Sequence, residues 1–427
     1  MVSKPARHAI VPASPLDYDV IISGAGLIGA ALAVALGRGG LRVLLLEVAG
    51  HRPRPPNSAD RRTTAVAAAS RQWLCDMALW RQAAREGGEI AAIRVSDRQS
   101  RMFLDFDPLA LIPKDQEQPL PRTLGTIVEN HILHEDFSAA IAELPQQITR
   151  MTVAEILSVK TDSVEAAPAK INCLTTGAEG TKTVEFTTHL LIATDGKNSP
   201  LRQMMGIESL AWDYDQTALV FIVQHQEPHQ SIAHERFLGG GPLAFLPLKE
   251  PNQSSVVWTE SKAVAAELAS LNSGELAEEL WVRFGSSLGG LQVLEPPKQW
   301  PLQFAMARRL VAPRFALAGD SAHLLHPIAG QGANLGWRDT ALLARLIIEA
   351  KAQGLDIGST TLLQKYEAQR WPDLISLSVV TNGLNRLFLS NRAEVAWLRS
   401  LGLGAVDHLP WLKKPLMLQA MGLGAGQ

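Results

Sequence analysis

The sequence has few of the features that mark secreted, metal-binding or nucleic-acid-binding proteins. It contains only two cysteines, Cys75 and Cys173, so neither a disulfide framework nor a zinc site can be built from cysteine pairs, and we expect a cytoplasmic setting. The formal net charge is only −2, which gives no reason to expect nucleic acid as a partner. The first residues contain no apolar run typical of a signal peptide, and no internal repeat is evident.

One uncharged run, VIISGAGLIGAALAVALG at residues 20–37, is long enough to raise the question of a membrane span. Its pattern argues against that reading. The β-branched stretch YDVIIS predicts a strand, and Gly24, Gly26 and Gly29 follow in G-x-G-x-x-G order, where a strand turns into a helix. LRVLLLE then predicts a second strand. We therefore expect a strand–helix–strand unit, buried on both faces of a parallel sheet.

This unit predicts a dinucleotide site, because each glycine has a separate use. Gly24 permits the tight turn, Gly26 lets a pyrophosphate approach the backbone, and Gly29 lets the helix pack against the strand. Glu47 ends the second strand, where its carboxylate can accept hydrogen bonds from ribose hydroxyls; the alternative is a solvated strand end. The cofactor contacts expected in the turn are Gly24, Ala25, Gly26, Ile28 and Gly29.

Two later segments also lead from a strand into a turn and a helix. In FALAGDSAHLLHPIAGQGANLGWRDTALLARLI, residues 315–347, Asp320 can accept a hydroxyl hydrogen bond, and a glycine-rich loop opens a helix whose N–H groups would face an anionic ligand. In HLLIATDGKNSPLRQMMGI, residues 189–207, a strand leads to Asp195. Asp320 could instead cap its loop, and Asp195 could form a structural pair with Arg202. The expected contacts are Asp195, Arg202, Gly319, Asp320, Gly332, Ala333 and Asn334.

In this order the three segments resemble the motifs of FAD-dependent group A aromatic hydroxylases, which share the 4-hydroxybenzoate-hydroxylase-like fold. The resemblance implies that the first segment holds the ADP part of FAD, the second its ribityl chain, and the third both FAD and NAD(P)H. Further segments resemble the ubiquinone-biosynthesis hydroxylases of this group: ADRRTTAVA (59–67), LGTIVENHIL (124–133), AHERFLGGGPLAFLPL (233–248), SSVVWTE (254–260) and the tail from residue 381. The chain departs from that family at Thr194, Ala333 and Trp337.

The resemblance also implies contacts at the flavin ring. Arg62 would lie against the flavin, although it could instead pair with Asp60, and Asn130 would contact the flavin. Pro327 lies in the loop that faces the ring, where a backbone carbonyl could meet a substrate hydroxyl. The residues expected to line the substrate pocket, or else to belong to the core, are Phe237, Leu246 and Trp258.

The function implied by the resemblance is hydroxylation of a polyprenylated phenol in ubiquinone biosynthesis, with O2 as co-substrate and FAD as cofactor. NAD(P)H, or a separate electron donor, would reduce the flavin. Because the chemistry takes place on the flavin, no side chain is assigned as catalytic, and no metal is expected at His323 and His326. A polyprenyl tail implies peripheral contact with the inner face of a membrane, and a biosynthetic complex is a possible partner. The alternatives are a flavin monooxygenase for a soluble aromatic substrate and a non-catalytic FAD-holding scaffold.

The predicted fold class is α/β, with a Rossmann-like FAD-binding domain, an inserted antiparallel-sheet substrate domain and C-terminal helices. The pieces FIVQHQ, PLAFLPL and SSVVWTE predict strands of the inserted sheet, and GELAEELWVRFG predicts a helix. The FAD-binding domain is expected at residues 17–95, 122–205 and 301–370, the substrate domain at 96–121 and 206–300, and the helical region at 371–427.

Overall fold

The strand–helix–strand unit predicted near the N-terminus is present. In the computed structural model, β2 (Tyr18–Ser23) and β3 (Val43–Val48) pair in parallel, and α1 (Leu27–Arg38) connects them. Most of α1 is buried, because helices pack on it as well as the sheet, which explains the uncharged run. In the described part of the chain, no helix combines the length and apolar character needed to cross a bilayer. The structure describes residues 11–12, 18–49, 62–97, 103–108, 122–161, 167–177, 180–389, 413–414, 417–418 and 421–423.

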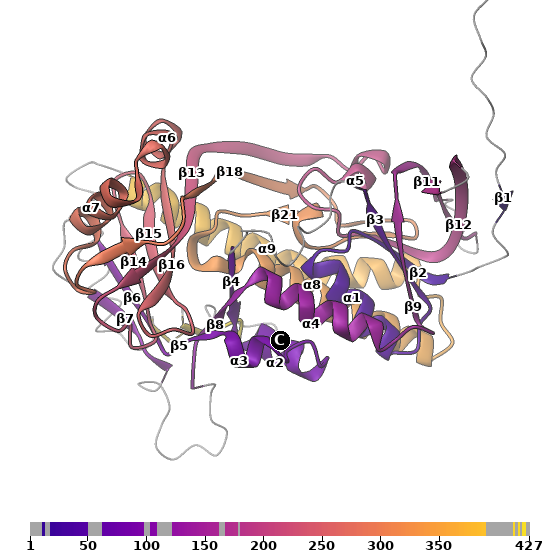
Figure 1. Ribbon diagram of the computed structural model, residues 1–427. Coiled ribbons are helices and arrows are strands. Elements are labelled where there is room, and N and C mark those ends of the chain that lie inside the picture. The colour runs from indigo at the N-terminus through magenta and orange to yellow at the C-terminus, as the bar shows by residue number, and fades with distance from the viewer. Residues whose placement is uncertain are drawn as a thin grey trace, which may run out of the picture.

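This unit belongs to a mixed sheet with the strand order β10-β11-β12-β2-β3-β9 (Figure 1). β20 pairs in parallel with residues 191–193 of β12, beyond the part of β12 that pairs with β11. The other strands of the sheet are β1 (Val11–Pro12), β9 (Ile148–Val153), β10 (Glu155–Lys160), β11 (Ala169–Gly177), β12 (Gly180–Ala193), β19 (Val311–Ala312) and β20 (Phe315–Leu317). In register, Ala193 of β12 lies opposite both Ser23 and Leu317. The three parallel strands β2, β12 and β20 therefore end at the same edge of the sheet, and the loops that follow them begin there.

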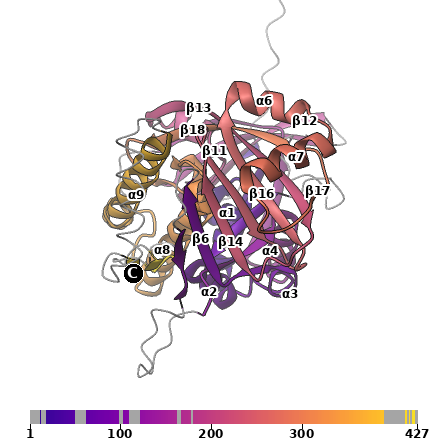
Figure 2. The same cartoon turned by 90° about the vertical axis from the view of Figure 1, so that its left-hand side faces the viewer.

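A second sheet has the order β21-β18-β13-β16-β15-β14-β6-β7, with β17 beside β13. Helices α6 (Lys262–Ser270) and α7 (Ser273–Phe284) cover one of its faces (Figure 2). The strand and helix predictions in residues 206–300 are confirmed. Its strands are β6 (Ala92–Asp97), β7 (Phe103–Phe106), β13 (Ser209–His225), β14 (Ile232–Phe237), β15 (Pro242–Pro247), β16 (Gln253–Ser261), β17 (Leu291–Val293), β18 (Lys298–Ala307) and β21 (His323–Leu324).

A small third sheet, of the order β4-β8-β5, lies between the two large sheets in sequence and space. It consists of β4 (Thr63–Ala67), β5 (Gly88–Ile90) and β8 (Gly125–Glu129). The helices outside the second sheet are α2 (Ala68–Asp76), α3 (Ala83–Glu86), α4 (Asn130–Ala142), α5 (Pro200–Met204), α8 (Gln331–Ala352) and α9 (Thr360–Leu389). Both α4 and α8 pack against α1.

The element boundaries differ from the expected domain limits at three places. The limit between residues 300 and 301 falls inside β18, which pairs with β13 in the second sheet. The limit at residue 95 falls inside β6, which pairs with β14 in the second sheet. The limit at residue 370 falls inside α9, because that helix continues through Pro372. Asp60, most of the expected segment 96–121, and most of the chain after residue 389 lie outside the described residues.

Candidate functional site

The three loops that leave the parallel strands lie side by side. The backbone N–H of Thr194 donates a 2.8 Å hydrogen bond to the Ser23 carbonyl, and that of Ala318 donates a 3.0 Å hydrogen bond to the Ala193 carbonyl. Together they form one wall of a cavity of about 1030 Å³. That volume is at the upper end of the range for ligand sites, which is roughly 300–1,000 Å³.

The glycine turn is shaped by the loop after β12. Gly24 has a φ of 108°, and a Cβ on it would collide with the Thr194 carbonyl. A Cβ on Gly29 would collide with the Gly24 carbonyl, so the first turn of α1 can approach β2 only when residue 29 is glycine. Gly26, by contrast, faces open space inside the cavity. The first backbone N–H groups of α1, which have no partner within the helix, therefore lie at the cavity wall.

Glu47 lies in the cavity wall and is not a solvated strand end. Its residue is only 5 % exposed, and Oε2 accepts a 3.0 Å hydrogen bond from the Arg150 guanidinium. A buried carboxylate is stable when it is paired in this way. Arg150 holds one carboxylate oxygen, and among the described residues no hydrogen bond is seen to the other, which can accept from a ligand hydroxyl.

The loop after β12 supplies Asp195 to the cavity but not Arg202. Asp195 Oδ2 accepts a 3.3 Å hydrogen bond from the Leu201 N–H, while Oδ1 is buried without a partner in the described structure. Burial raises the pKa of Asp195 above its ordinary value. Arg202 donates instead to the carbonyls of Ser321 (2.7 Å) and Lys197 (2.9 Å) and does not line the cavity. Arg202 therefore braces one loop against the other.

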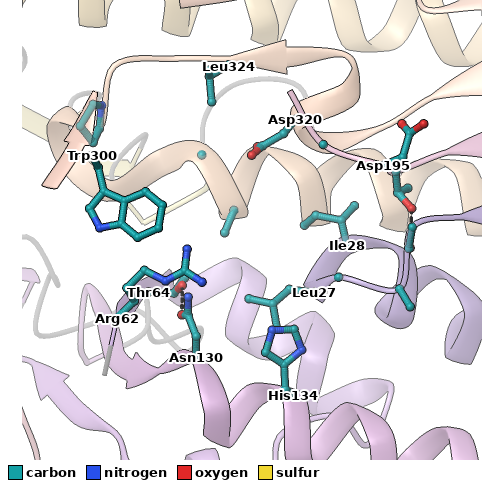
Figure 3. A pocket seen from close by; sticks show the side chains of 18 of the residues that line it. Leu27, Ile28, Arg62, Thr64, Asn130, His134, Asp195, Trp300, Asp320 and Leu324 are labelled. Carbon is teal, nitrogen blue, oxygen red and sulfur yellow. Dashed lines mark hydrogen bonds between the residues drawn. The ribbon is translucent and has the colours of Figure 1, made fainter. Parts of the chain in front are cut away.

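Asp320 projects into the middle of the cavity (Figure 3). Its side chain is accessible from the cavity, yet the surrounding protein raises its pKa by desolvation. Gly319 has a φ of 65° and donates its N–H to Asp339 Oδ2 over 2.8 Å, but it does not line the cavity. The carboxylate of Asp320 can thus accept hydrogen bonds from a hydroxylated ligand.

The start of α8 forms another part of the wall. Gly332 and Ala333 line the cavity, whereas Asn334 is buried behind them. Asn334 accepts from the Ala67 N–H (2.8 Å) and donates to the Ala65 carbonyl (2.7 Å), so it holds β4 against α8. The positive end of the α8 dipole faces the cavity, which favours a ligand with negative charge.

One end of the cavity is aromatic and polar, as Figure 3 shows. The Arg62 guanidinium lies 4.6 Å from the centroid of the Trp300 ring, and Asn130 Oδ1 accepts a 2.6 Å hydrogen bond from the Thr64 hydroxyl. Pro327 also lines the cavity. Sequence reasoning missed Trp300, because no recognisable motif surrounds it in the sequence.

The residues expected in the substrate pocket do not line this cavity. Trp258 is fully buried in the core beneath α6 and α7, and its Nε1 donates to Glu260 over 3.3 Å. Phe237 stacks on Phe388 at 3.5 Å, with both rings buried. Leu246 is half-buried on the opposite face of the sheet from Trp258. The two aromatic residues are therefore packed as core residues.

The two histidines considered as metal ligands are buried and point to different partners. His323 Nε2 lies 2.7 Å from Asp339 Oδ2, and His326 Nδ1 accepts from the Ile328 N–H at 3.3 Å. Within the described ranges, no group of three or more histidine, cysteine, aspartate or glutamate residues has metal-binding geometry. His323 is therefore part of the support beneath the Gly319 loop.

Comparisons with known proteins agree with this geometry. Residues 17–375 match the family described as FAD binding domain. The chain is 36% identical to ubiquinone hydroxylase UbiL of Rhodospirillum rubrum, covering 95% of this chain and 89% of that protein. It is 30% identical to the 3-demethoxyubiquinol 3-hydroxylase of Escherichia coli, covering 95% and 98%. The crystal structure of p-nitrophenol 4-monooxygenase from Pseudomonas putida superposes with a TM-score of 0.74 at 18% identity, covering 96% and 98%.

The residues present fit FAD. The open face of Gly26 at the start of α1 suits a pyrophosphate, and the half-free carboxylate of Glu47 suits a ribose. Asp320, accessible in the middle of the cavity, suits a ribityl hydroxyl, and the unpartnered Oδ1 of Asp195 calls for a donor.

Proposed function

Because the chain belongs to the FAD-binding family of ubiquinone-biosynthesis hydroxylases and is an FAD-dependent aromatic hydroxylase, we propose that its substrate is a polyprenylated phenol. The observation that carries the proposal is the continuous cavity between the Gly24 turn and Trp300, with Asp320 between them. The sequence identity of 36% and 30% with two ubiquinone-pathway hydroxylases, each over 95% of this chain, supports the substrate class.

Bound FAD supplies the redox chemistry and the activation of O2, so the side chains need only bind, orient and exclude water. We assign the pyrophosphate to the N–H groups around Gly26, the ribose to Glu47 and the ribityl chain to Asp320. The remaining proposed contacts are Ala25, Ile28, Arg62, Asn130, Asp195, Gly332, Ala333 and Pro327. Gly29, Arg202, Gly319 and Asn334 act behind the wall, where they fix the positions of these groups.

The electron source and the site of action follow from the chemistry of the substrate. A hydride donor such as NAD(P)H, or a separate reductase, must reduce the flavin in each cycle. Because a polyprenyl tail partitions into lipid, we propose that the enzyme works peripherally at the inner face of a membrane, beside other enzymes of the pathway. Co-flotation with vesicles that contain the substrate checks this part separately.

The direct test combines the cofactor and the reaction. The purified protein is expected to show a flavin absorption spectrum and to consume NAD(P)H faster when a prenylated phenol is added, with one oxygen atom appearing in the product by mass spectrometry. A strain that lacks the gene is expected to accumulate a precursor that carries one ring hydroxyl fewer than the product. A bound flavin without turnover of any phenol would indicate the scaffold alternative, and turnover of only tail-free phenols would indicate a soluble substrate.

A further inference from the structure

Glu235 in β14 has a carboxyl group without a partner among the described residues. Its register neighbours are Val95 on β6 and Ala244 on β15, which are both apolar. In the part of the chain that the structure describes, no hydrogen bond or ion pair reaches the Glu235 carboxyl group. Burial raises the pKa of Glu235 to about 7. The residue nevertheless keeps part of its surface accessible. An unpaired carboxyl in such a place is costly, so a ligand that donates to it would be favoured.

The direction of Glu235 follows from the alternation of the strand. Its neighbour His234 lies edge-on to Phe284 of α7, on the helix-covered face of the sheet. Ala233, two residues before Glu235, packs instead in a cluster with Ile127 of β8 and Ala65 of β4. Glu235 therefore lies on the face that packs toward the small sheet, whose strand β4 forms part of the cavity wall.

The register also gives the separation of Glu235 from the cavity. Thr63 lines the cavity, and its hydroxyl lies 2.8 Å from the Ser255 hydroxyl on β16. Ser255 lies opposite Leu246 of β15, and Ala244, two residues earlier in β15, lies opposite Glu235. Two strand spacings and a two-residue step place the Cα atoms of Ser255 and Glu235 roughly 12 Å apart. The Glu235 side chain and the cavity wall therefore lie on either side of the same interval, beside Ala244 and Leu246.

We propose that Glu235 binds the substrate by accepting the hydrogen of its phenolic hydroxyl. The inference rests on the proposed function and names the recognition group for that substrate. In the carboxylate form, Glu235 accepts the O–H of the phenol. If the proton passes over, the phenol O–H bond breaks, a bond to the carboxylate oxygen forms, and the negative charge moves to the ring oxygen. The ring becomes richer in electrons, as electrophilic hydroxylation requires.

The test uses the holoenzyme and two ligands that differ in one group. The first is a phenol with a two-isoprene tail, and the second is its methyl ether, which cannot donate a hydrogen bond. Binding is measured by the change in flavin fluorescence for the wild type, Glu235→Gln and Glu235→Leu. The control is Glu278→Gln, which removes the same charge from an exposed position on α7. Flavin content shows that each variant is folded.

The wild type and the control are expected to prefer the phenol over the ether by roughly 10- to 100-fold, the range for a hydrogen bond to a charged group. Glu235→Leu is expected to bind both ligands alike, and Glu235→Gln to retain a smaller preference. A Glu235→Leu protein that keeps the full preference would overturn the inference while leaving the proposed function intact. A wild type that binds neither ligand would overturn both together.

Discussion

The Gly319 backbone N–H donates a 2.8 Å hydrogen bond to Oδ2 of Asp339, a residue that is wholly buried in α8. The same oxygen lies 2.7 Å from His323 Nε2, and Oδ1 accepts a 2.6 Å hydrogen bond from Arg370 of α9. Burial alone would raise the pKa of Asp339, but the charges of His323 and Arg370 lower it below the ordinary value. Asp339 thus ties the loop that carries Asp320 to two helices behind it.

Asp339→Asn is expected to weaken both the fold and the hold on FAD. The change removes one of the two carboxylates that pair with the buried Arg370, since Asp373 Oδ2 still accepts from it, and it weakens a charge-assisted hydrogen bond worth about 1.5–3 kcal/mol. Since the folded-state pKa of Asp339 is lowered, its contribution is present above pH 3.8 and lost as the pH falls through the lowered value. Urea unfolding at pH 7 and FAD titration measure the two effects. Asp76→Asn, at an exposed position, is the control, and an unchanged FAD affinity in Asp339→Asn would refute the support role.

Gly29→Ala is expected to abolish tight FAD binding. The added methyl group would collide with the Gly24 carbonyl, so α1 must move away from β2 and the pyrophosphate site opens. Overpacking of this kind costs typically about 1–3 kcal/mol of stability. Gly383→Ala is the matched control, because a Cβ at that helical position meets nothing within 4 Å. Flavin retained on gel filtration distinguishes the two variants; equal retention would contradict the assigned role of Gly29.

Glu47→Gln is expected to lower FAD affinity roughly tenfold, the lower end for a hydrogen bond to a charged group. The Arg150 side chain is partly exposed, so water replaces its lost partner and stability changes little. Glu143→Gln, which disrupts the exposed pair with Arg81, serves as the control. Competition by ADP-ribose should weaken in parallel with FAD; a defect limited to FAD would mean that Glu47 does not hold the ribose.

His326 is expected to make the protein sensitive to mild acid. Burial lowers the pKa of His326 to about 4 from an ordinary 6.5, and its ring neighbour Tyr214, with a pKa raised to about 12, carries no charge. The neutral histidine therefore contributes stability above pH 6.5 that is lost as the pH falls through 4, up to about 3 kcal/mol. Thermal unfolding between pH 4 and 7 should show a smaller slope for His326→Gln than for the wild type. Identical slopes would show that protonation of the His326 ring does not change the stability of the fold.

The cofactor-binding core could be predicted from the sequence because its motifs depend on the backbone. Gly24 and Gly29 are required by close contacts, so their spacing identifies them, and Asp320 follows a strand end where the family resemblance implies the ribityl chain. The sequence could not distinguish a residue in the wall from one behind it. Arg202 and Asn334 were expected as contacts, but their side chains turn away to bind neighbouring backbone groups.

The residues around the substrate were harder to predict. The alternation of a β-strand decides which face each side chain points to, and the register of that strand is set by strands that are distant in the sequence. Trp258 and Leu246 are both apolar strand residues, yet they lie on opposite faces of the second sheet. Trp300 lies near the start of β18, opposite Ala218 of β13, and lines the cavity. Nothing near residue 300 in the sequence encodes that position.

The pairing of β20 with β12 has a consequence for how the protein matures. A chain emerging from the ribosome can form β2, α1 and β3 early, but the wall that contains Asp320 follows β20, after more than two-thirds of the chain has been made. Stable flavin capture is therefore a late event, possible only once both distant segments have met. The colour of bound flavin therefore reports that β20 has paired with β12.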